Sequence, residues 1–92
     1  MNEQRRELTI VNRRGLHARA SAKFVNAVAQ LPEGVKVEVA KDGNCAAGGS
    51  ILGLMMLGAA KGDRIEVKVV GDDSGKVMEQ LCTLVDGGFG EE

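Results

Sequence analysis

The sequence has 92 residues, 43% hydrophobic and 27% charged, a balance typical of one globular domain spanning 1–92 rather than a disordered chain. Only 2% are aromatic, so aliphatic side chains must form the core, and a large cofactor cannot be enclosed. The net charge of -1 argues against nucleic-acid binding, and no apolar segment is long enough for a bilayer. Residues 1–7 lack the apolar core of a signal peptide, so we expect a cytoplasmic location.

The first half of the chain contains three predicted strands and one helix. Alternating apolar residues predict a strand over Glu7–Asn12, and a helical apolar pattern follows over Ala18–Gln30. Alternation returns over Val35–Ala40, which predicts a half-buried strand. The dipeptide Asp42-Gly43 favours a tight hairpin turn, so a short strand is expected at 45–47.

The second half continues with a helix, a strand and a last helix. Ser50 is a suitable N-cap for a short apolar helix over Ile51–Leu57. The clearest alternation in the chain predicts a strand over Arg64–Val69. Cap residues at 72–74 then open a helix that ends near Asp86, and the tail Gly88–Glu92 is expected to fray. Strands with polar outer faces, in this order, predict an α+β fold with one sheet covered by helices on a single side.

The two cysteines do not indicate a redox or metal site. Cys45 and Cys82 lie far apart and form no CxxC motif, which argues against a metal-carrying protein. In a cytoplasmic protein both are expected to be free thiols. Cys45 is predicted to lie in a strand and Cys82 in the core on a helix face.

His17, the only histidine, lies in a loop directly before a predicted helix. Backbone N–H groups at a helix start are unpaired and the local dipole is positive, so the backbone of Ala18 and Arg19 can hold a phosphate. The Arg19 side chain can add charge-assisted hydrogen bonds. A neutral imidazole can attack phosphorus directly. The residues alone leave a second interpretation open, in which this histidine only caps the helix or fills surface.

Two segments carry a resemblance to a known family. Gly15–Ala20 (GLHARA) resembles the active-site signature of HPr, the histidine-containing phosphocarrier of the bacterial sugar phosphotransferase system. Gly49–Gly58 (GSILGLMMLG) resembles the regulatory-serine segment of the same family. The similarity runs from about Glu7 to Asp86, and the two motifs have the family spacing. Ala20 departs from the pattern, because many family members have proline there.

The resemblance implies a fold and a mechanism. The fold is an open-faced β-sandwich, βαββαβα, with a four-stranded antiparallel sheet in the order 1-4-2-3 and three helices on one face. Phosphate from phosphoenolpyruvate would pass through enzyme I to Nδ1 of His17, and then to a histidine of an IIA-type acceptor. Arg19 would orient and neutralise the phosphoryl group. The chain would be a monomeric transfer intermediate rather than an enzyme, with no cofactor and no metal.

The segment after Gly49 has structural and functional interpretations. Ser50 can act only as an N-cap, whereas the resemblance adds phosphorylation by a dedicated serine kinase. One face of the following helix is predicted to pack on the core through Ile51, Leu54 and Leu57. The other apolar side chains predict a partner surface, on which the family docks enzyme I and its acceptors. We expect that interface to contain Ala20, Leu52, Met55 and Met56; the alternative is a loosely packed helix without a partner.

Three other functions compete with the phosphocarrier. The first is a regulatory module that acts through Ser50 without phosphoryl transfer, and the presence of both His17 and Arg19 speaks against it. The second is a phosphocarrier of a nitrogen-related regulatory branch. The third is a ferredoxin-like RNA-binding module, which would stack bases on aromatic residues that these predicted strands lack.

Overall fold

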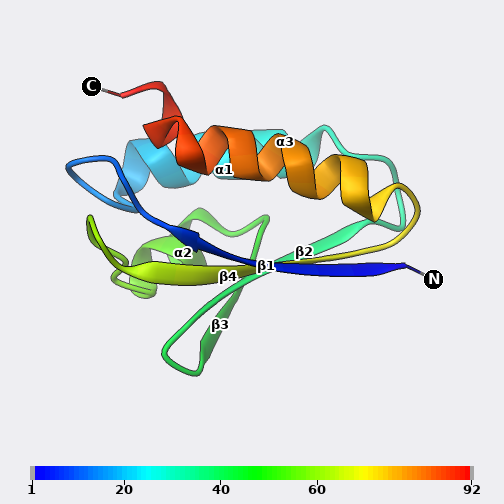
Figure 1. Cartoon of the computed structure of the whole chain (residues 1–92), viewed down its shortest axis with the longest axis horizontal. Coiled ribbons are helices and arrows are strands. Elements are labelled where there is room, and N and C mark those ends of the chain that lie inside the picture. Colours follow the sequence, from blue (N-terminus) through cyan, green and yellow to red (C-terminus); the bar gives the residue numbers. More distant parts are fainter. Residues whose placement is uncertain (1, 92) are drawn as a thin grey trace.

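The computed structural model describes residues 2–91, and in it helices cover one face of an antiparallel sheet. Its elements are β1 (Glu3–Thr9), α1 (Ala18–Ala29), β2 (Lys36–Lys41), β3 (Asn44–Ala47), α2 (Ile51–Met56), β4 (Arg64–Val70), α3 (Ser74–Asp86) and a 3₁₀ turn, η1 (Gly88–Gly90). The four strands have the order β1-β4-β2-β3, which confirms the sheet implied by the resemblance. Figure 1 shows α1 and α3 on the same side of this sheet, and α2 contacts α1 and β3.

The first strand begins earlier than predicted. β1 pairs antiparallel with β4 from Glu3 opposite Val70 to Thr9 opposite Arg64, so the predicted range Glu7–Asn12 is wrong at both ends. The start carries charged, exposed side chains, which hide an edge strand from a search for apolar alternation. Backbone pairing with β4, rather than burial, therefore sets the start of this strand.

The core lies between the sheet and the helices. Ile65, Val67 and Val69 of β4 are fully buried, as their alternation predicted, and each helix adds apolar side chains such as Phe24 of α1. Cys82 is buried on α3 and Cys45 is exposed in β3; both are free thiols at the predicted positions. Within residues 2–91, no helix has the length and apolar character required to cross a membrane.

The short helix α2 differs from its predicted packing in one residue. Ser50 is the N-cap, and its Oγ accepts a hydrogen bond of 2.9 Å from the Gly53 N–H. Leu54 and Leu57 are buried as predicted, but Ile51 is exposed. Three residues of helix turn through about 300°, so Ile51 is rotated about 60° from Leu54, to the margin of the buried face.

The tail after α3 is folded, so the predicted fraying is wrong for residues 88–91; Glu92 lies outside the described residues. The Phe89 side chain is buried in the core, although its backbone has a left-handed φ of 58°. The Lys23 ammonium of α1 donates a 2.6 Å hydrogen bond to the Phe89 carbonyl. The tail is therefore held on α1 next to the loop that precedes this helix (Figure 1).

Candidate functional site: a basic cleft around His17

The loop that carries His17 is fixed by backbone contacts. Gly15 has a left-handed φ of 63°, and a Cβ there would overlap the Ala59 carbonyl oxygen. The next residue, Leu16, donates its N–H to that same oxygen at 2.9 Å. Only glycine permits this close approach, which ties the loop to the segment that follows α2. His17 then occupies the N-cap position of α1 with an extended backbone.

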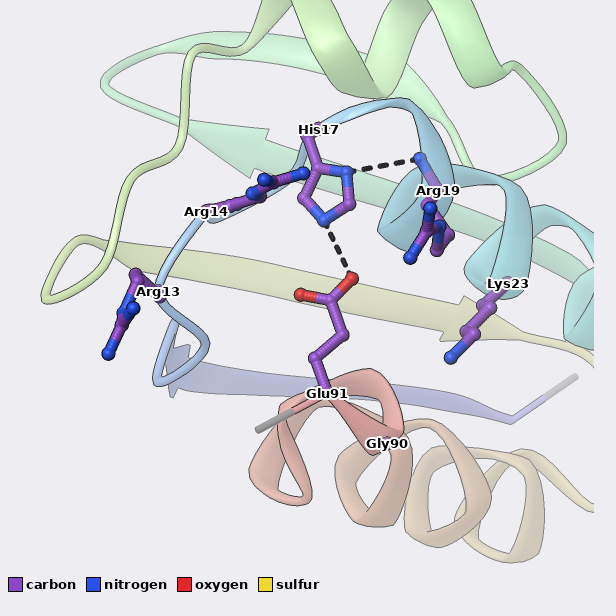
Figure 2. Close-up of a pocket in the computed structure, with 7 residues that line it drawn as sticks. All are labelled: Arg13, Arg14, His17, Arg19, Lys23, Gly90 and Glu91. Atoms are coloured by element: carbon purple, nitrogen blue, oxygen red, sulfur yellow. Dashed lines mark hydrogen bonds and ion pairs between the residues drawn. The ribbon is translucent and has the colours of Figure 1, made fainter.

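The two ring nitrogens of His17 have different partners (Figure 2). Nδ1 accepts a 3.2 Å hydrogen bond from the Arg19 N–H, as the N-cap of α1. Nε2 lies 2.7 Å from Oε2 of Glu91. A backbone N–H can only donate and an ionised carboxylate can only accept, so this arrangement assigns the proton to Nε2 and leaves the lone pair on Nδ1.

Glu91 is itself held by a buried amide. Asn12 is almost fully buried, and its Nδ2 donates to Oε1 of Glu91 at 3.1 Å and to the Gly15 carbonyl at 2.8 Å. The pKa of the Glu91 carboxyl lies below its usual value, first because Asn12 donates to it and further because His17 and Lys23 are close. The carboxylate is therefore ionised next to the imidazole.

Basic side chains surround this pair. A cleft of about 590 Å³ is lined by Arg13, Arg14, His17, Arg19, Lys23, Gly90 and Glu91. In Figure 2 two arginines stand on one side of the imidazole, and Arg19 and Lys23 stand on the other. Four cations face one carboxylate, which gives the cleft an excess of positive charge suited to a phosphate-sized anion.

The family model described as the HPr component phosphorylation site of the phosphotransferase system matches residues 4–86. The chain belongs to the HPr family. The phosphocarrier protein HPr of Neisseria meningitidis is 44% identical over 87 residues, which cover 95% of this chain and 96% of that protein. HPr of Pseudomonas putida is 41% identical over 86 residues, or 94% of each chain. The phosphocarrier protein NPr of Shewanella violacea is 32% identical over 91 residues, covering 99% of this chain and 98% of that protein.

Solved HPr structures have the same fold. HPr from Thermoanaerobacter tengcongensis superposes with a TM-score of 0.86 at 34% identity, covering 100% of this chain and 99% of that one. HPr from Bacillus anthracis gives a TM-score of 0.84 at 26% identity, covering 92% of this chain and 99% of that one. The family predicted from the two sequence motifs is thus confirmed.

The residues predicted from the HPr resemblance fall into two places. His17 and Arg19 share the basic cleft, whereas Ser50 and the exposed side chains of α2 do not line it. Leu52 and Met56 are 67% and 77% exposed, so they are accessible to a partner. The prediction for Ala20 is wrong: its side chain faces the core from α1 and is fully buried, so a partner cannot contact it.

Sequence reasoning missed several residues of the cleft. Arg13 and Arg14 stood out in the sequence only as a short basic pair. Lys23 lies a little more than one helical turn beyond Arg19, and this spacing places Arg19 and Lys23 on one face of α1. The spacing could therefore have identified Lys23 as a residue of the cleft from the sequence. Glu91 gave no such signal, because it follows a glycine-rich segment with no periodic pattern.

Proposed function

We propose that Nδ1 of His17 accepts a phosphoryl group from phosphorylated enzyme I and passes it to a histidine of an IIA-type acceptor. The observation that carries this proposal is the position of Nδ1 at the start of α1, inside a cleft with four cationic side chains. The Nδ1 lone pair forms the new N–P bond while the bond from phosphorus to the donor breaks, and the electrons of that bond remain with the donor. The Nε2 proton stays on His17 throughout.

The negative charge of the transferred group would be stabilised by the backbone N–H groups at the start of α1 and by the Arg19 side chain. A phosphoryl oxygen would replace Nδ1 as the acceptor for the Arg19 N–H, and another could accept from the Ala18 N–H; neither group is paired within the helix. The Arg19 guanidinium is exposed on the rim and can follow the group as it moves between donor and acceptor. Such donors stabilise the transition state because charge is spread over the oxygens at that moment.

Docking and regulation belong to α2 in this proposal. Leu52, Met55 and Met56 form an exposed apolar surface of the type that partner proteins cover. Ser50 lies at the start of the same helix and would be the target of a serine kinase. We place the protein in the cytoplasm, as a single-domain monomer that meets each partner in turn.

The test is intact-mass spectrometry after incubation with phosphoenolpyruvate and enzyme I. The parent protein should gain the mass of one phosphoryl group, and the adduct should be labile in acid and stable in base, as a phosphoramidate is. Omission of enzyme I should abolish the gain. Unchanged enzyme I-dependent labelling of His17→Asn would overturn the assignment.

A further inference from the structure

The contact between Glu91 and His17 is not used by the transfer step described above. We propose that Glu91 is a positioning residue: through Nε2 it holds His17 in the tautomer whose Nδ1 can attack phosphorus, and it balances the positive charge of the phosphorylated ring. The proposal rests on phosphoryl acceptance at His17 and adds a second residue to that reaction.

The geometry of the pair supports this role. The 2.7 Å distance between Nε2 and Oε2 is short, and the side chains of His17 and Glu91 are only 23% and 17% exposed. Partial shielding from water strengthens a charge-assisted hydrogen bond. Without the carboxylate, only the 3.2 Å bond from the Arg19 N–H to Nδ1 opposes exchange of the proton between the two nitrogens, and the form with Nδ1–H has no lone pair for the phosphorus. A carboxylate at Nε2 opposes that form.

The carboxylate is placed by contacts on both sides. Asn12 Nδ2 faces two acceptors, the Gly15 carbonyl and Oε1 of Glu91, so its amide orientation follows from the hydrogen bonds. Because Gly15 belongs to the His17 loop, one amide joins the loop to the carboxylate. The buried Phe89 and its bond to Lys23 anchor the tail just before Glu91. The position of the carboxylate is therefore set by the fold.

Glu91 can affect the reaction because the charge of the His17 ring changes when the ring is phosphorylated. When Nδ1 bonds to phosphorus, its lone pair enters the new bond and the ring, which keeps its Nε2 proton, becomes cationic. Glu91 accepts the hydrogen bond of that cation at close range, so the product of phosphoryl acceptance is stabilised. In the reverse sense, loss of Glu91 should make the phosphorylated ring less stable. Partners that orient metal-ligating histidines are typically worth about 10–100-fold in metal affinity or activity, and we expect an effect of similar size here.

The test uses the full chain with Glu91→Ala and Glu91→Gln, and with Glu79→Gln as a matched control on the exposed face of α3. Two quantities are measured on each: the ¹⁵N chemical shifts of the His17 ring without phosphate at about pH 8, where an ordinary imidazole is neutral, and the initial rate of phosphorylation by enzyme I. The chemical shifts report the tautomer, which a merely structural role of Glu91 would not change.

We expect the parent and Glu79→Gln to have the proton mainly on Nε2. Glu91→Ala should show a mixture of tautomers and a rate lower by about 10–100-fold, with Glu91→Gln between the two. Parent-like shifts and rate in Glu91→Ala would overturn this inference while leaving the proposed function intact. A parent protein that accepts no phosphoryl group would instead overturn the proposed function.

Discussion

Nε2 of His17 lies 2.7 Å from a carboxylate oxygen of Glu91, which is 74 positions further along the chain. The imidazole thus meets the tail after α3, and Asn12, from the segment after β1, donates a hydrogen bond to the same carboxylate. The chemistry of the ring depends on this assembly, because each nitrogen has one defined partner.

Two substitutions of His17 should separate its role in phosphoryl transfer from its contribution to the stability of the fold. His17→Ala removes both the phosphoryl acceptor and the N-cap of α1, so we expect no phosphorylation and a loss of about 0.5–2 kcal/mol in the free energy of unfolding. His17→Asn also lacks the acceptor but retains a good cap, so its stability should lie closer to that of the parent. Denaturant titration and intact mass check the two effects, and equal stability of both variants would contradict the capping role.

Arg19 should affect transfer more than docking. Arg19→Ala should bind enzyme I normally and transfer more slowly, by on the order of 10²–10³, because one charged donor to the transition state is lost. Arg19→Lys should recover only part of the rate, since an ammonium cannot form the two parallel hydrogen bonds of a guanidinium. Rapid-quench kinetics with enzyme I measure the rates. A parent-like rate for Arg19→Ala would reassign this residue to the solvated surface.

A negative charge at Ser50 should favour the helix and oppose docking. Ser50→Asp keeps an acceptor for the Gly53 N–H at the positive end of α2, so its melting temperature should match or exceed that of the parent. The same charge lies next to Leu52 and Met55, and its desolvation against a partner is unfavourable. Ser50→Asp should therefore bind enzyme I more weakly, as calorimetric titration would show. Parent-like binding would leave Ser50 as a cap alone.

Ser50→Ala is the matched control for that charge. It removes the cap, for which we expect a loss of about 1 kcal/mol in stability. It adds no charge to the docking surface, so enzyme I binding and His17 phosphorylation should remain close to those of the parent. A strong binding defect in this variant would indicate that the fold of α2, rather than the charge, controls docking.

The contribution of Glu91 to stability should depend on pH. Its pKa is lowered in the folded protein by Asn12 first, and further by His17 and Lys23. A lowered folded-state pKa means that the stabilisation is present above the ordinary value of 4.5 and is lost as the pH falls through the lower folded value. The difference in unfolding free energy between the parent and Glu91→Gln should therefore be present above pH 4.5 and shrink as the pH falls below that value. A difference independent of pH would contradict an ionised, hydrogen-bonded Glu91.

Patterns in the sequence predicted the parts of the fold that depend on residues close to one another along the chain. The alternation of Ile65, Val67 and Val69 predicted the central strand β4, and Ser50 predicted the start of α2. The strand order came from the family resemblance, because pairing between distant strands leaves no periodic signal. β1 was placed too late because an edge strand paired on one side needs no apolar alternation.

Only the part of the candidate site that lies within one short sequence segment could be predicted. His17 and Arg19 share one motif at a helix start, and both were found. Phe89 sits among glycines, which look flexible, so the burial that orders the tail was missed together with Glu91. Ala20 was assigned to the surface from its place in the motif, although its helical position turns it toward the core. Contacts between the two ends of the chain could be identified only from the three-dimensional structure.

The bond between the Leu16 N–H and the Ala59 carbonyl joins the His17 loop to the segment after α2. In the proposed function, a partner that docks on α2 would meet a histidine already in position, so binding would cost no free energy for ordering this loop. Association of such preformed surfaces is limited by diffusion and orientation, typically at about 10⁵–10⁷ M⁻¹s⁻¹. In the proposed function, a low affinity would then not slow phosphoryl delivery, and it would allow rapid release, so that one small surface could serve several partners in quick succession.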